Sequence, residues 1–182
     1  MIDPVEGNIN HVQGMTDWCV TATLIRDNVP VLTVIHLPLT DETYTALRGS
    51  GAWLNGTRLH VSNKSSLDTA LVGTGQAALG ESSDTYRRIG LSVSAMLEAG
   101  LLMRMSVPST LQLMHVAAGR MDMFWQFSQV RSGLVSGALL VTEAGGTISD
   151  TQGRAWTLAS DDFLATAPRL HAAAVGVLST IC

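Results

Sequence analysis

The chain has 182 residues, of which 46% are hydrophobic and only 14% are charged, and its mean hydropathy is +0.26. Eleven Lys and Arg against 15 Asp and Glu give a net charge of −4 without a basic cluster, which argues against a nucleic-acid partner. Two cysteines make no disulfide framework, and no apolar run is long enough to cross a bilayer, so we expect a cytoplasmic protein with no membrane partner. The apolar excess indicates that some apolar surface is covered by another chain or segment, which favours self-association.

Residues 1–80 read mainly as antiparallel sheet. Runs rich in Val, Thr and Ile alternate with turn residues, as in hairpins. We expect strands at residues 17–26, 29–37, 43–47 and 70–74. Glycines and an asparagine mark a further hairpin, at Gly49, Gly51, Asn55 and Gly56.

Residues 81–182 read as alternating helices and strands. Ser83 or Asp84 should cap a helix that ends at Ala99, and Ser109 should cap a second helix that ends at Gly119. An apolar helix is expected over 134–144, and Pro168 occupies the favoured first position of the last helix. Strands are expected at 101–105, 121–127, 147–149 and 163–166. The pattern predicts one layered α/β domain over residues 1–182.

The segment from Asp3 to Asn10 combines two carboxylates with a proline, a glycine and amide side chains. Magnesium prefers oxygen ligands and shares its coordination shell between one or two carboxylates and phosphate oxygens. Pro4 restricts the backbone of Asp3, and Gly7 lets successive N–H groups turn toward an anion. An acidic surface turn is the alternative interpretation of this segment.

A known family offers a match to this segment and to three others. Residues 1–14 resemble the first signature of the inositol monophosphatase family, within the magnesium-dependent, lithium-sensitive phosphatase superfamily. The run from Leu139 to Gly146 resembles the end of its second signature. The hairpin over residues 48–62 and the stretch from Val116 to Asp122 also match, and the order and spacing hold from residue 1 to about Thr166.

The resemblance implies a fold, a reaction and a set of ligands. The fold would be the C-terminal portion of an α-β-α-β-α sandwich, and the family is expected to form homodimers. The activity would be hydrolysis of small polyol or sugar phosphates by a metal-dependent phosphomonoesterase of the inositol-phosphate phosphatase type. Magnesium would be held by Asp3, the Val5 carbonyl and Glu6, and the phosphate by the N–H groups of Gly7 and Asn8.

Several positions depart from the family pattern. Glu6 replaces an aspartate, and Asn8 replaces the threonine that helps orient the attacking water. Gln126 replaces a glutamate that grips a substrate hydroxyl, and Gly133 falls where a third metal carboxylate is expected. The glycine-threonine pair of the family falls on Val107-Pro108. An N-terminal helical segment and a further metal glutamate would precede Met1, so we expect the domain to be N-terminally incomplete.

These departures leave three hypotheses open. The chain is an impaired phosphatase with a weak or partial Mg²⁺ site, a non-catalytic relative that acts as a binding or regulatory module, or a fragment completed by a missing segment or a partner. Isolated histidines and the many methionines are expected to be structural, and Cys19 is expected to be a buried thiol.

Overall fold

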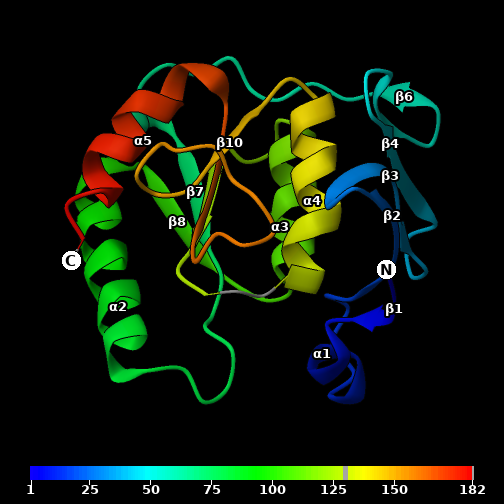
Figure 1. The fold of residues 1–182 in the computed structure, drawn as a ribbon, viewed down its shortest axis with the longest axis horizontal. Coiled ribbons are helices and arrows are strands. Elements are labelled where there is room, and N and C mark those ends of the chain that lie inside the picture. The colour runs from blue at the N-terminus through cyan, green and yellow to red at the C-terminus, as the bar shows by residue number, and fades with distance from the viewer. Residues whose placement is uncertain (129–130, 182) are drawn as a thin grey trace.

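The computed structural model describes residues 1–128 and 131–181 (Figure 1). Its N-terminal third is a six-stranded antiparallel sheet in the order β1-β2-β3-β4-β5-β6. The strands are β1 (Ile2–Glu6), β2 (Cys19–Arg26), β3 (Val29–Leu37), β4 (Glu42–Leu47), β5 (Gly51–Leu54) and β6 (Thr57–Arg58). A short helix, α1 (Asn8–Val12), links β1 to β2.

A second, mixed sheet of five strands has the order β10-β11-β9-β7-β8. Its strands are β7 (Leu71–Thr74), β8 (Leu102–Met105), β9 (Met123–Gln126), β10 (Thr147–Ser149) and β11 (Phe163–Thr166). Strand β7 pairs in parallel with β8 and β9, whereas β11 is antiparallel to both of its neighbours. The helices are α2 (Ser83–Ala99), α3 (Ser109–Ala117), α4 (Arg131–Glu143) and α5 (His171–Leu178), with 3₁₀ turns at Leu67–Thr69 and Pro168–Leu170.

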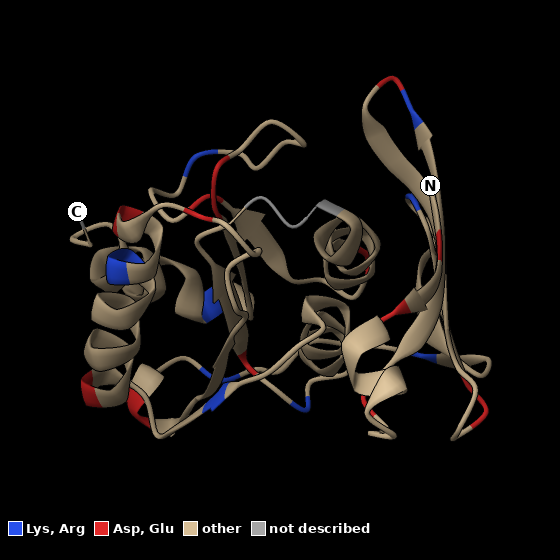
Figure 2. Cartoon of the chain, turned by 90° about the horizontal axis from the view of Figure 1, so that it is seen from below, with Lys and Arg blue, Asp and Glu red and all other residues tan. Residues whose placement is uncertain are grey.

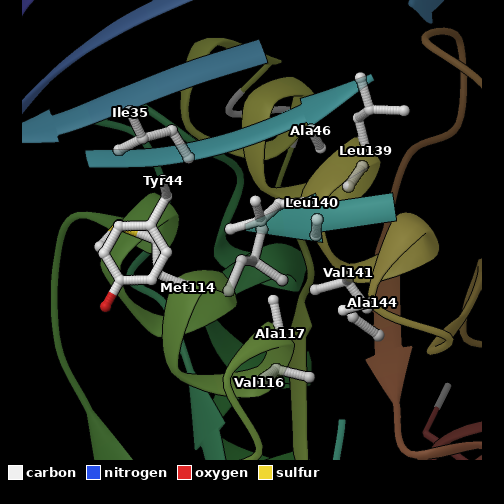
Figure 3. Packing of buried hydrophobic residues seen from close by; sticks show 14 of the residues in the cluster. Ile35, Tyr44, Ala46, Met114, Val116, Ala117, Leu139, Leu140, Val141 and Ala144 are labelled. Atoms are coloured by element: carbon white, nitrogen blue, oxygen red, sulfur yellow. The ribbon is translucent and has the colours of Figure 1, made fainter. Parts of the chain in front are cut away.

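The elements stack as helix, sheet, helix and sheet (Figure 1). Helices α3 and α4 lie between the two sheets and are seen nearly end-on in Figure 2, whereas α2 and α5 cover the other face of the five-stranded sheet. Lys and Arg are scattered over separate elements in Figure 2 rather than gathered together. Figure 3 shows Ile35, Tyr44 and Ala46 of the six-stranded sheet beside Leu139 and Leu140 of α4. All five side chains are at most 2% exposed, so this packing fixes the sheet against α4.

The outer face of the six-stranded sheet is apolar and open to solvent. Because side chains alternate along a strand, the partners of the buried row point outward. On that face Ile2, Leu24, Leu32 and Leu47 are 75, 53, 39 and 50% exposed.

No helix within the described ranges has the length and apolarity needed to span a membrane.

Most of the expected elements are confirmed. The strand over 29–37 and the end of α2 before Gly100 agree with the structure. The expectation that Ser109 caps α3 is wrong, because Pro108 occupies the cap and the Ser109 hydroxyl bonds instead to Gln126. The expectation that Ser83 or Asp84 caps α2 is also wrong, because the cap is Ser82, whose hydroxyl accepts a hydrogen bond from the Thr85 N–H. Cys19 is buried as expected, and Cys182 lies outside the described residues.

Candidate functional site

A cleft of about 470 Å³ opens at the junction of α1 with two loops of the second half. One loop joins β7 to α2 and contributes Gln76, Ala77 and Leu79; the other joins β8 to α3. Candidate residues from the N-terminal motif and from β9 line the same cleft, namely Glu6, Gly7, Asn8 and Gln126. The fold therefore brings together residues that are far apart in the sequence.

Strand β1 places its two carboxylates on the inner side of the sheet. Asp3 pairs with Thr21 and Glu6 pairs with Cys19, both inward-facing positions of β2. Residues three apart in a regular strand point to opposite faces, but the register shifts between Asp3 and Glu6. This irregularity lets both carboxylates face the interior. The Asp3 carboxylate also accepts the Val5 N–H at 3.1 Å.

Glu6 is held in surroundings that disfavour its charge. Its side chain belongs to a residue only 6% exposed, and its carboxyl shares a hydrogen bond with Asp3. Burial, then that hydrogen bond, then the charge of Asp3 raise the pKa of Glu6 from 4.5 to about 8. A proton shared between two neighbouring carboxyl groups relieves the repulsion between their negative charges. A bound cation would relieve that repulsion in the same way, so such a pair is suited to bind a cation.

Gly133, near the start of α4, faces the Glu6 carboxylate. A Cβ atom at position 133 would lie 2.9 Å from Oε1 of Glu6, closer than real Cβ contacts allow. The longer side chain of Glu6 thus occupies the space that a side chain at position 133 would need. The Gly133 carbonyl accepts the hydroxyl of the buried Thr110 at 2.8 Å, so its role is in fixing α4 against α3.

Gly7 begins α1 in a conformation that requires glycine. Its φ is +91°, and a Cβ atom there would lie 2.8 Å from the Asp17 carbonyl and 3.1 Å from Cδ of Pro108. Asn10 ties this region together, since its side-chain nitrogen donates to the carbonyls of Asp17 and Val107 at 2.7 and 2.8 Å. Pro108 offers no N–H to a bound anion at the wall beside Gly7.

Gln126 lies at the end of β9 and is fully buried. The Ser109 hydroxyl donates to its carbonyl oxygen, and its amide nitrogen donates to the Gln76 carbonyl at 3.3 Å. Gly75 is required beside it, because a Cβ at that position would lie 2.5 Å from the Gln126 side-chain oxygen. The amide is thus engaged at both ends within the protein.

Cys19 sits across from Glu6 on β2 and is fully buried. Burial, and after it the charges of Glu6 and Asp3, raise the pKa of its thiol to about 12. The thiolate, which is the reactive form, is therefore absent at neutral pH. Cys19 contributes packing beneath the site rather than a nucleophile.

The carboxylates present fit one cation better than two. The Asp3 and Glu6 carboxylates are oxygen donors of the kind that magnesium takes while retaining several waters. Among the described side chains, no cation pairs with either carboxylate, and no group of three or more His, Cys, Asp or Glu is arranged to hold a metal. Two closely spaced cations would need more negative ligands than this set supplies.

Several residues that shape the cleft have no functional signal in the sequence. Asn10 belongs to the first signature but only the structure reveals its bridge to Val107. Ile9, Ala77 and Leu79 form apolar wall, and nothing in their spacing indicates it. The one sequence signal that could have indicated this wall is a large hydrophobic residue in a loop, as at Leu79.

Comparisons with known proteins agree with this geometry. The inositol monophosphatase family profile matches residues 1–181. An inositol-1-monophosphatase of Rhizobium meliloti is 37% identical over 153 residues, which are 84% of this chain and 57% of that enzyme. A Nus factor SuhB of Pseudomonas aeruginosa is 36% identical over 153 residues and is covered to 56%. The structure of inositol monophosphatase from Anabaena superposes with a TM-score of 0.87 at 28% identity, covering 100% of this chain and 71% of that one.

The chain therefore spans a little over half the length of the two curated relatives and about two-thirds of the solved structure. The family is generally magnesium-dependent and of phosphomonoesterase type. The shared profile, the strand and helix order and the mixed α/β layers establish that this chain belongs to the inositol monophosphatase family.

Proposed function

We propose that this chain carries a weakened phosphomonoesterase site for small polyol or sugar phosphates. The observation that carries the proposal is the Asp3–Glu6 pair: Glu6 lines the cleft and occupies the space beside Gly133, and its carboxyl is hydrogen-bonded to that of Asp3. No cationic side chain in the described part of the chain pairs with these two inward-facing carboxylates. Burying them therefore costs free energy and does not stabilise the fold. A bound cation would compensate that cost.

Each residue has a proposed role. Asp3, the Val5 carbonyl and Glu6 would hold Mg²⁺, which when bound polarises a phosphoryl oxygen and lowers the pKa of an attacking water. Glu6 must first release its proton. The N–H groups of Gly7 and Asn8 would hold the phosphate at the exposed start of α1.

Three features should lower the rate of phosphate ester hydrolysis at this site. Glu6 retains a proton at neutral pH, Gly133 offers no carboxylate, and the Asn8 side chain lacks the hydroxyl of the family threonine. Gln126 is neutral and already bonded to Ser109 and Gln76, so it grips a substrate hydroxyl poorly. Loss of one metal carboxylate should lower the rate by about a thousandfold or more.

The second candidate is a non-catalytic relative that binds or regulates. The same protonated Glu6 and the Pro108 packed beside Gly7 favour it, since both reduce the capacity for a metal and an anion. One relative is named a Nus factor, which allows a regulatory role within the family.

Phosphate release from inositol 1-phosphate, with a series of Mg²⁺ concentrations at pH 7 and pH 9, tests the choice. The proposal predicts slow release that needs millimolar Mg²⁺ and increases toward pH 9 as Glu6 loses its proton. Glu6→Gln serves as the control preparation and should show none. Equal phosphate release by both proteins would come from a contaminating phosphatase. That result, or no phosphate release at all, would favour the non-catalytic binding module.

A further inference from the structure

The cleft beside the proposed phosphate site has an unusually apolar wall. Its apolar members come from three separate segments and include Ile9 of α1, Leu79 of the β7–α2 loop and Val107 of the β8–α3 loop. These side chains are 68, 98 and 39% exposed, although each is large and hydrophobic. Ala77 and Pro108 extend the same wall.

Two of the polar side chains that line the cleft, Gln126 and Asn10, are committed to the protein itself, whereas those of Asn8 and Gln76 are exposed. Gln126 accepts from Ser109 and donates to Gln76, and the Asn10 nitrogen donates to two backbone carbonyls. A polyol offers a hydroxyl on almost every carbon, and each loses water when it enters. Two exposed amide side chains are too few to pair with all of those hydroxyls, so the remaining ones would be buried at a cost.

An apolar group meets the opposite situation. It loses no hydrogen bonds on entry and covers the exposed surfaces of Ile9, Leu79 and Val107. The volume of about 470 Å³ lies within the range of small-molecule sites, which typically pair an apolar lining with a few polar anchors. Here the anchor end is formed by Glu6, Gly7 and Asn8.

We propose that the cleft takes phosphate monoesters of an aryl group, about one or two aromatic rings in size, in preference to polyol phosphates. The inference rests on the proposed function, because the phosphate end must be held by the Asp3–Glu6 region. The ring lies against Ile9, Leu79 and Val107, and the phosphate faces Gly7 and Asn8. Covering about 60 Å² of apolar surface at the usual transfer free energy per unit area corresponds to about a tenfold gain in affinity.

Binding calorimetry on the 182-residue chain at pH 9 with 10 mM Mg²⁺ separates the contributions. The probes are inorganic phosphate, inositol 1-phosphate, 1-naphthyl phosphate and the phosphate-free 1-naphthol. We expect 1-naphthyl phosphate to bind about tenfold more tightly than inorganic phosphate, and inositol 1-phosphate to gain nothing over inorganic phosphate.

Matched variants locate the effect. Leu79→Gln and Ile9→Gln should each remove most of the naphthyl gain while leaving the affinity for inorganic phosphate unchanged. Leu97→Gln is the control, since Leu97 is also an exposed leucine, at 60%, but lies on α2 away from the cleft lining. It should keep the full gain.

The outcomes are distinct. If inorganic phosphate does not bind, the proposed phosphate site fails and this inference fails with it. If inorganic phosphate binds but the naphthyl ester is no tighter, or the inositol ester is tighter, only the aryl preference is overturned. Equal affinity for 1-naphthol and 1-naphthyl phosphate, or an equal loss in Leu97→Gln, would also overturn it.

Discussion

Two buried carboxyl groups in this protein have opposite surroundings. The Asp122 carboxylate accepts hydrogen bonds from Nζ of Lys64 at 2.8 Å and from the Leu71 N–H at 2.7 Å, so its negative charge is compensated. Glu6 has nearly the same low exposure, 6% against 2%, but its charged neighbour is Asp3. A compensated carboxylate stabilises the fold, whereas one placed beside a second carboxylate remains costly until it binds a proton or a cation. The same residue chemistry is structural in one place and a candidate ligand in the other.

Removing Asp122 should give the largest loss of stability from a single substitution at neutral pH. Asp122→Ala deletes two hydrogen bonds to a buried carboxylate and leaves the Leu71 N–H without its partner, so the free energy of unfolding should fall by about 3 kcal/mol. Urea unfolding at pH 7 measures it. Asp84→Ala is the control, because the Asp84–Arg87 pair is exposed on both sides and should change stability by about 0.5 kcal/mol or less. Equal effects would contradict a structural role for Asp122.

Glu6 should instead make the stability of the protein depend on pH. The folded protein keeps the Glu6 proton up to about pH 8, whereas the unfolded chain loses it near pH 4.5. The unfolded state therefore binds fewer protons within that window, and stability falls as the pH rises through it, by up to about 1.4 kcal/mol per pH unit. Above the folded pKa the loss is complete.

Glu6→Gln should flatten this part of the profile. Urea unfolding without divalent ions at pH 5.5, 7 and 8.5 compares the variant with the unmodified chain. The variant should be the more stable protein at pH 8.5. A parallel pair of profiles would mean that Glu6 is charged at neutral pH and would remove the contrast with Asp122.

A smaller effect concerns the thiol beneath the site. Cys19 is fully buried and its pKa is raised to about 12, so alkylation by iodoacetamide at pH 8 should be negligible in the folded protein and complete in urea. The measurement is made in a Cys182→Ser background, so that only Cys19 reports. Rapid labelling of the folded protein would show that water reaches the carboxylate pair.

The sequence anticipates the elements that depend on local patterns. The strand over 29–37 and the glycine stop after α2 follow from alternation and from backbone preference, which neighbouring residues decide. These features need little knowledge of distant parts of the chain.

The sequence does not anticipate features that arise from packing between distant segments. Strand β1 looked like a turn because Pro4 and two carboxylates are poor strand formers, yet pairing with β2 makes it an edge strand. The loss of a ligand at Gly133 was visible, but not that Glu6 fills its space. The apolar wall joins α1 to two loops that only the fold brings together.

The contact between Glu6 and Gly133 also makes a specific restoration possible. Gly133→Asp alone should gain less than the double variant, because the new Cβ would lie 2.9 Å from Oε1 of Glu6 and the Glu6 side chain would have to shift. Shortening Glu6 at the same time frees that space. The double variant Glu6→Asp with Gly133→Asp should therefore bind Mg²⁺ more tightly, whereas Gly133→Ala with Glu6→Asp is the matched control without the added carboxylate.

Magnesium titration by calorimetry at pH 8, on the unmodified chain and on these two double variants, tests the central claim most directly. We expect at most one weakly bound Mg²⁺ in the unmodified chain, with Kd of about 1 mM or above, and about tenfold tighter binding in the variant that carries Asp at both positions. The alanine control should show no such gain. Tight binding of two or more ions by the unmodified chain would contradict the account of a carboxylate pair that is short of ligands.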